Sequence, residues 1–432
     1  MLSGTVLLVL FLVLMFIGIP IAHSMIITAY ITIKVVHPEI PTIIVAQRLF
    51  GGVDNYILLC IPFFILAGDL MSLTTLFDRL IKVADAMVGH IRGSLSHITI
   101  VVSMFFAGIT GAAVADTSAV GTVLIPAMIK QGYTRGYATA LTVVASTIGV
   151  IIPPSNLMVV AALVSSSSVA ALLLGGVIPG IMAGLSLLVV SAYYGFRHGF
   201  PKSPKISWRD RGLALWHGIP ALGIPVVLMG GILTGIVTPT EAANISIVYA
   251  MIVGPILMRG FPPARKLYEA SVGVCTRTSA VMMAVGASII FGWILAVAEV
   301  PEAIAAFITS YTTSKILIIA GMLFTYLAIG TFLDAIPIIL IFTPIFLPLA
   351  EKLGIPTVAF MVTMVFAAAM GLASPPCGSC LWVGAAIGEI QVERFTWELM
   401  PFLAAMTVIL ILIAYIPELV MWVPDLVLGA IK

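Results

Sequence analysis

Charged residues are scarce in this 432-residue chain, in which 20 Lys and Arg and 18 Asp and Glu make up 9% of the sequence. A soluble domain contains about 25% charged residues. So few charged side chains cannot cover the surface of a protein of this size, which excludes a soluble fold. The formal net charge of +2 also excludes a strongly basic surface for nucleic acid.

Cysteine and histidine are scarce as well, with four and six residues in the whole chain. The cysteines lie in apolar stretches and imply no secreted disulfide framework. The histidines form no cluster with metal-ligand spacing, and we expect no cofactor. The sequence lacks Gly-x-x-x-x-Gly-Lys-Ser/Thr, so it offers no P-loop for ATP.

Apolar residues are abundant, at 61% of the chain with a mean hydropathy of +1.21. Because a spanning helix needs about 20 apolar residues, this content predicts on the order of ten to twelve membrane passages. The first 20 residues lack the Lys/Arg-rich start of a signal peptide, so we expect a retained membrane helix there. The chain is predicted to be an all-α polytopic membrane protein.

Two basic segments interrupt the apolar sequence. The first, residues 197–211, contains five of the 20 basic residues, and the second contains Arg259, Arg265, Lys266 and Arg277. Short loops rich in Lys and Arg stay cytoplasmic, and two predicted helices over residues 213–258 return the chain to the same side. Residues 73–92 mix charged and apolar side chains, which predicts an amphipathic helix along the membrane interface.

An internal repeat is the most informative feature. A shift of 222 positions places Gly and Pro residues of segment 108–154 on identical residues further along the chain. The matched pairs are Gly108 with Gly330, Pro126 with Pro348, Gly132 with Gly354, Gly149 with Gly371, and Pro153-Pro154 with Pro375-Pro376. Such coincidences are rare, so we infer a duplication. The loop after the first hairpin is more basic than its counterpart, which favours two units of opposite orientation.

Each unit contains an interrupted apolar stretch followed by a helix with a Pro-Pro pair. We expect re-entrant hairpins that break near Gly108, Gly111 and Gly121 in the first unit and near Pro337, Pro344 and Pro348 in the second. A Pro-Pro pair frees backbone carbonyls, which hydrocarbon cannot satisfy, so each break must line a polar cavity or an ion. Paired interrupted segments indicate a transporter binding site.

Two acidic residues lie in these hairpins, Asp116 and Asp334. An ionisable group at membrane depth is costly and usually functional, although a structural salt bridge or an interface position remains the alternative for each. Oxygen-bearing residues around the breaks suit a small hard cation, while the ends of the broken helices offer carbonyls to a cation and a positive dipole to an anion. By contrast, Asp69 is predicted at the membrane interface and Glu241 as a helix cap.

Three other classes of function share part of this pattern. An intramembrane aspartyl protease places a catalytic Asp in Gly-x-Gly-Asp, and neither Asp116 nor Asp334 has that context, so we expect no enzyme. A passive channel would explain the hairpins but not the duplicated binding residues. A sodium- or proton-coupled elevator carrier that works without a binding protein remains the alternative.

These motifs together resemble the large membrane subunit of tripartite ATP-independent periplasmic (TRAP) transporters. The resemblance rests on Gly108 to Asp116, Gly149 to Ser155, Thr238 to Ala243, Asp334, and Gly371 to Gly378, and it covers essentially the whole chain. It implies an inverted-repeat elevator-type transporter of the bacterial inner membrane that takes up a small carboxylate with sodium. It also implies two partners: a periplasmic binding protein and a small four-helix membrane subunit, expected as a separate polypeptide.

The resemblance also implies roles for individual residues. One sodium half-site would contain Thr110, Gly111, Asp116 and Ser155, and the other would contain Asp334, Ser374 and Gly378. Asn156, Pro154 and Pro376 are assigned to the substrate. The expected domains are N-terminal scaffold helices (1–95), a first transport unit (96–196), a basic loop with scaffold helices (197–314), a second transport unit (315–395) and a C-terminal helix (396–432).

Overall fold

The computed structural model describes residues 2–74, 76–202, 207–234, 236–258 and 262–429, and these residues form helices and loops without any strand. Among the described residues, six helices are long and apolar enough to cross a membrane, or eight if each of two bent pairs is one span. The chain is therefore an all-helical multi-pass protein, as predicted. The predicted ten to twelve passages exceed this number, because other apolar helices, such as Ile21–Val36, Lys315–Gly330 and Thr357–Gly371, have only 10–17 residues.

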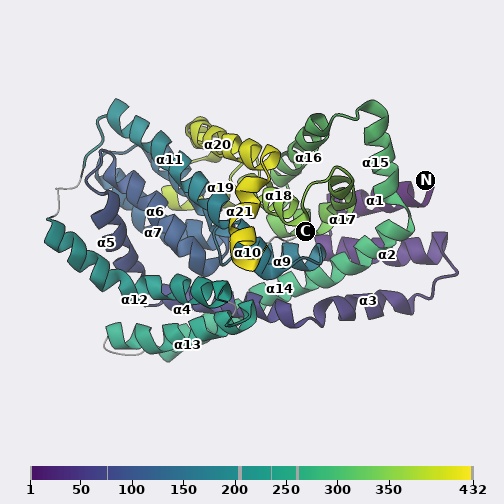
Figure 1. Cartoon of the computed structure of the whole chain (residues 1–432), viewed down its shortest axis with the longest axis horizontal. Coiled ribbons are helices and arrows are strands. Elements are labelled where there is room, and N and C mark those ends of the chain that lie inside the picture. The colour runs from purple at the N-terminus through teal and green to yellow at the C-terminus, as the bar shows by residue number, and fades with distance from the viewer. Residues whose placement is uncertain (1, 75, 203–206, 235, 259–261, 430–432) are drawn as a thin grey trace.

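The first half of the chain runs from α1 to α11 (Figure 1). Its elements are α1 (Leu2–Phe16), α2 (Ile21–Val36), α3 (Ile43–Val53), η1 (Tyr56–Leu59), α4 (Cys60–Ser72), α5 (Leu76–Val88), α6 (Ser94–Thr110), α7 (Ala113–Lys130), α8 (Arg135–Thr147), η2 (Ile148–Val150), α9 (Asn156–Val164), α10 (Val169–Gly175) and α11 (Val177–Arg197).

The second half runs from α12 to α21. Its elements are α12 (Trp208–Leu233), α13 (Pro239–Met258), α14 (Ala264–Val297), α15 (Val300–Tyr311), α16 (Lys315–Gly330), α17 (Ala335–Lys352), α18 (Thr357–Gly371), α19 (Ser379–Gly388), α20 (Val392–Tyr415) and α21 (Glu418–Leu428).

The repeat found in the sequence is also present in the helix boundaries. Helices α7 and α17 begin and end 222 positions apart, and so do the first residues of α8 and α18. Gly132 and Gly354 both have a positive φ just after these hairpin helices, which is where glycine ends a helix at no steric cost. Both Pro-Pro bonds are cis. The two units therefore share helix limits and turns as well as the matched Gly and Pro residues.

The two halves exchange packing partners. Helix α2 packs on α14 while α13, its equivalent after a shift of 222 positions, packs on α4. In the same way α9 packs on α17 and α19 packs on α7. Reciprocal contacts of this kind follow from a pseudo-two-fold relation between repeats. They also bring the broken helix of each unit against the hairpin of the other.

Most of the residues that were predicted to mark the hairpin breaks do not lie at the turns. The first turns at Gly111 and Ala112, whereas Gly121 lies inside α7. The second turns over residues 331–334, and Pro344 and Pro348 lie inside α17. Proline can remain in a membrane helix when neighbouring helices and local adjustments satisfy the freed carbonyls, so these prolines do not mark the break.

The second basic segment is not a loop as predicted. Arg265, Lys266 and Arg277 belong to α14, a continuous helix of 34 residues, and Arg259 lies outside the described residues. The amphipathic segment does form a helix, α5, which packs on α6 and α12. Glu241 caps α13 as expected, because its carboxylate accepts hydrogen bonds from the backbone N–H of Thr238 (2.7 Å) and from its hydroxyl (2.9 Å).

Candidate functional site

The tip of the first hairpin lies against the first helix break. Gly111 has φ of +58°, and a Cβ atom there would lie 2.9 Å from the backbone N of Asn156 and 3.1 Å from the carbonyl oxygen of Pro154. Only glycine allows both this conformation and this close approach. The structure thus brings together three residues that the sequence assigned to the site. The side chain of Thr110, a fourth, is not among those that the structure describes.

Ser155 bridges the two sides of that break. Its hydroxyl donates to the carbonyl oxygen of Val150 at 2.6 Å and accepts from the backbone N–H of Met158 at 3.2 Å. The residue is fully buried and serves as the N-cap of α9. One of the carbonyls freed by the Pro-Pro pair is therefore satisfied by a side chain, and the backbone around it is held in a fixed geometry.

Asp334 lies at the corresponding tip of the second hairpin. It is the N-cap of α17, where its Oδ1 accepts from the backbone N–H of Ala335 at 2.8 Å. The residue as a whole is exposed, and it lines the cavity described below. The positive end of the α17 dipole adds to the stability of the ionised form.

The second break closes against its own hairpin through two glycines. A Cβ atom on Gly371 would lie 2.6 Å from the Cα of Gly330, so α16 and α18 cross with their backbones in contact. The amide of Gly378 donates to the Ser374 carbonyl at 3.2 Å, and the Ser374 hydroxyl donates to the Met370 carbonyl at 2.8 Å. Pro376 is exposed.

A cavity of about 710 Å³ opens where these parts meet. One wall is formed by the tip and first turns of α7, the start of α9, and Asp334 at the start of α17. The rest of the lining comes mainly from α4 and α14. The lining residues include Gly111, Asn156 and Asp334 from the predicted set and Ile65, Asp69, Ser72, Arg277 and Val281 from the facing helices. Its volume falls in the range of small-molecule sites.

The other predicted residues whose side chains the structure describes do not line this cavity. Asp116 is fully buried in the first turn of α7, and Pro154 and Ser155 are buried in the break. Ser374, Gly378 and Pro376 belong to the second break and are not among the cavity-lining residues.

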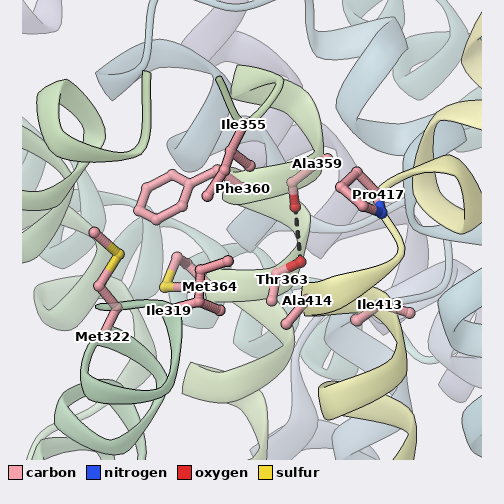
Figure 2. A pocket seen from close by; sticks show the side chains of 10 residues that line it. All are labelled: Ile319, Met322, Ile355, Ala359, Phe360, Thr363, Met364, Ile413, Ala414 and Pro417. Atoms are coloured by element: carbon pink, nitrogen blue, oxygen red, sulfur yellow. Dashed lines mark hydrogen bonds between the residues drawn. The ribbon is translucent and has the colours of Figure 1, made fainter. Parts of the chain in front are cut away.

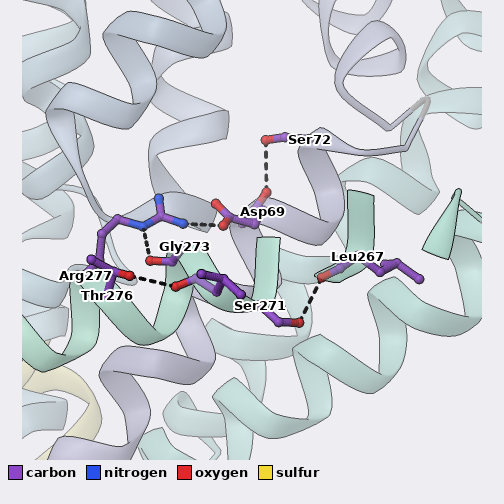
Figure 3. Close-up of polar contacts among 9 residues, drawn as sticks. Asp69, Ser72, Leu267, Ser271, Gly273, Thr276 and Arg277 are labelled. Atoms are coloured by element: carbon purple, nitrogen blue, oxygen red, sulfur yellow. Dashed lines mark hydrogen bonds and ion pairs between the residues drawn. The ribbon is translucent and has the colours of Figure 1, made fainter. Parts of the chain in front are cut away.

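Two charged residues of the cavity were missed by the sequence reasoning. Asp69 lies on α4 and Arg277 lies in α14 rather than in a loop. Both line the cavity and form an ion pair there (Figure 3). The guanidinium Nε also donates to the carbonyl oxygen of Gly273 at 3.2 Å. Arg277 lies close to the apolar stretch 280–297, and a charged residue that borders such a stretch is a signal that could have found this site.

A second gap between α16, α18 and α20 has a different character (Figure 2). It has room for about 10 Å³, and its lining is mostly aliphatic and aromatic. The hydroxyl of Thr363 there donates to the carbonyl oxygen of Ala359 at 2.8 Å. This gap is a packing defect of the core, since it has neither the size nor the polar groups of a binding site.

A duplicated helical membrane fold whose hairpin tips and broken helices meet at one cavity defines a membrane transporter. The chain belongs to the family described as "Tripartite ATP-independent periplasmic transporter, DctM component", whose model matches residues 8–419. This confirms the family that the motifs indicated.

Three known proteins illustrate the similarity. The sialic acid TRAP transporter large permease protein of Vibrio cholerae is 32% identical over 96% of this chain and 97% of the relative. The isethionate TRAP transporter permease protein of Oleidesulfovibrio alaskensis is 36% identical over 94% of this chain and 64% of that longer protein. The crystal structure of the YdaH transporter of Alcanivorax borkumensis, 12% identical, shares the fold, with a TM-score of 0.62 over 88% of this chain and 87% of that one.

Proposed function

We propose that this chain moves a small organic acid across the bacterial inner membrane, driven by a sodium gradient. The observation that supports this proposal best is the cavity, which holds the carboxylate of Asp334 on one wall and the guanidinium of Arg277 on the other. A carboxylate with accessible oxygen suits Na⁺, and a guanidinium suits an acid group. Both transported species would thus have a partner of opposite charge.

The substrate class is proposed from family membership together with this charge pattern. The relatives named above transport sialic acid and isethionate, a carboxylate and a sulfonate. Both compounds present one oxoanion group on a polar body, and the cavity of about 710 Å³ is large enough for either. We expect a substrate of this chemistry, with selection among acids made largely by a periplasmic binding protein that delivers it.

Sodium would bind at the two hairpin tips. In the first unit we propose Thr110, Gly111, Asp116 and Ser155, and in the second Asp334, Ser374 and Gly378. The geometry in support is that Gly111 lies against the break, that Ser155 fixes the backbone there, and that Asp334 faces the cavity. Asn156, Pro154 and Pro376 would contact the substrate, and of these only Asn156 lines the cavity.

An elevator movement is the proposed route across the membrane. The cavity is lined by the tip of the first hairpin, by Asp334 and by α4 and α14, which belong to the segments expected as scaffold and also pack on α6 and α17. Movement of the hairpin units past these helices would expose the acid alternately on each side. The scaffold would also bind a small four-helix subunit, and α12 and α13 expose apolar side chains that face lipid or such a partner, among them Trp216, Val226, Val248 and Ile252.

Reconstitution in proteoliposomes tests this function. The chain is inserted with its small subunit, and the binding protein is added with a panel of labelled acids, namely sialic acid, isethionate and succinate. We expect uptake of at least one acid under an inward sodium gradient and none with ATP in place of the gradient. Uptake that follows ATP or a pH gradient alone would refute sodium coupling, and full-rate uptake without the binding protein would favour the alternative carrier.

A further inference from the structure

The ion pair between α4 and α14 occupies an unusual position. Arg277 lies thirteen residues after the first residue of α14, about 20 Å along the helix axis, in the wall of the central cavity. Its Nη2 donates to Oδ2 of Asp69, a residue 208 positions away in the chain. The side chains are 44% and 25% exposed, so the pair is open to whatever enters the cavity.

This pair has little value as a structural tie. Ion pairs with solvent access contribute little to stability, and α4 and α14 already pack on each other directly. The two charges lie in the cavity wall, where they can act on a solute that enters. The position of the pair in the cavity wall therefore calls for a functional reason.

The charges that line the cavity give that reason. Among the described residues, the charged ones that line it are Asp69, Asp334 and Arg277, so an entering acid would meet the guanidinium of Arg277. A guanidinium has five N–H donors, and the contacts with Asp69 and the Gly273 carbonyl use two of them. The remaining donors are enough for the two oxygens of a second carboxylate or sulfonate.

We propose that Arg277 binds the acid group of the transported substrate, and that Asp69 positions its guanidinium and competes with the substrate for it. This inference rests on the proposed function and adds to it a residue that selects for charge. Before the acid enters, Asp69 neutralises the guanidinium. When the acid is bound, the guanidinium donates hydrogen bonds to both the Asp69 carboxylate and the acid group of the substrate. The negative charge of Asp69 then weakens substrate binding enough to permit release.

The variants follow from these roles. Arg277→Gln removes the charge-assisted hydrogen bonds, which raises the KM for the acid about 10- to 100-fold. Arg277→Lys keeps the charge without the planar fork and lies between wild type and Arg277→Gln. Asp69→Asn keeps the shape but removes the competing charge, so it lowers the KM.

A matched control pair lies on the same helix. Arg265 and Glu269 are four residues apart on α14, 2.8 Å from each other and 89% and 57% exposed, and they are not among the cavity-lining residues. Arg265→Gln and Glu269→Gln make the same charge changes away from the cavity. Both are expected to leave the KM unchanged.

Sodium-driven uptake by the reconstituted complex tests the proposal, with competition by sialic acid, isethionate and succinate and by the neutral amide of each. Wild type should prefer each transported acid over its amide, Arg277→Gln should lose most of that preference, and Asp69→Asn should increase it. If Arg277→Gln and Asp69→Asn both lower the rate while KM and acid-to-amide preference stay at wild-type values, the pair is structural and the proposal is wrong. If wild type itself takes up none of the three acids with sodium, the proposed function fails instead.

Discussion

Replacement of Gly111 by alanine should separate the first hairpin tip from the helix break. The residue has φ of +58°, and its added Cβ would lie 2.9 Å from the backbone N of Asn156 and 3.1 Å from the Pro154 carbonyl oxygen. A side chain in the left-handed region costs about 1–2 kcal/mol. Both atoms in contact belong to the backbone, so relief requires movement of the hairpin or the break, and overpacking costs about 1–3 kcal/mol more.

Gly132 provides the matched control for this substitution. It has φ of +91°, and a Cβ atom there would meet nothing within 4 Å. Gly132→Ala therefore has the cost of a side chain in the left-handed region but no steric clash with the backbone. The difference between the two variants, about 1–3 kcal/mol, corresponds to about 5- to 150-fold in the population of the competent site.

Sodium-driven uptake and thermal unfolding of both purified variants give the comparison. We expect Gly111→Ala to lose uptake about 5- to 150-fold relative to Gly132→Ala, with similar yields and monodisperse protein for both. Equal uptake by the two variants would show that the contact between hairpin tip and break is not required for transport, and the arrangement of the site proposed above would be wrong.

Further variants test the second unit. Asp334→Asn should be nearly inactive, because it removes the charge that offsets ion desolvation, and an unchanged sodium dependence of uptake would make the carboxylate structural. Ser374→Ala should cost less, about 1–3 kcal/mol, with uptake that recovers at high sodium; a loss that no sodium concentration restores would contradict a ligand role. Gly371→Ala should lower the thermal unfolding temperature strongly, because its Cβ would meet the Cα of Gly330 at 2.6 Å. By contrast, Gly321→Ala on α16, the helix that contains Gly330, meets nothing within 4 Å and should change stability by less than about 1 kcal/mol. Equal stability of these two variants would contradict the close helix crossing.

The repeat was predictable because it depends on residues with few alternatives. Gly132 has a positive φ, and Gly371 lies at a close backbone contact. Such glycines, like a Pro-Pro pair at a helix break, keep their spacing when a unit is duplicated. Apolar residues do not give such a signal, because many of them satisfy the same lipid or core environment. Helices α7 and α17 begin and end 222 positions apart, so the repeated Gly and Pro residues mark the same helix limits in both units.

The ion pair could not be predicted in the same way. Asp69 and Arg277 are 208 positions apart, and their meeting depends on how α4 packs on α14. Arg277 also follows three other basic residues of the second basic segment, so charge counting placed it in a loop, although α14 continues through it without interruption. A residue's depth along a helix depends on where the helix begins, which is the least certain part of a sequence reading.

The breaks of the second hairpin show the same limit. Three prolines predicted the interruption within α17, yet the chain turns before it, at residues 331–334, and Asp334 caps the new helix. Neighbouring helices can absorb the bonds that proline removes, and their positions are not visible in a local pattern.

The dependence of steady-state accumulation on the sodium gradient tests the central claim most directly. Proteoliposomes with the complete complex are loaded at a series of inward sodium gradients, and the ratio of internal to external acid is measured at each. The account predicts that accumulation rises steeply with the sodium gradient and collapses when a sodium ionophore dissipates it. Accumulation that stays constant across sodium gradients, or that follows ATP or the pH gradient, would contradict it.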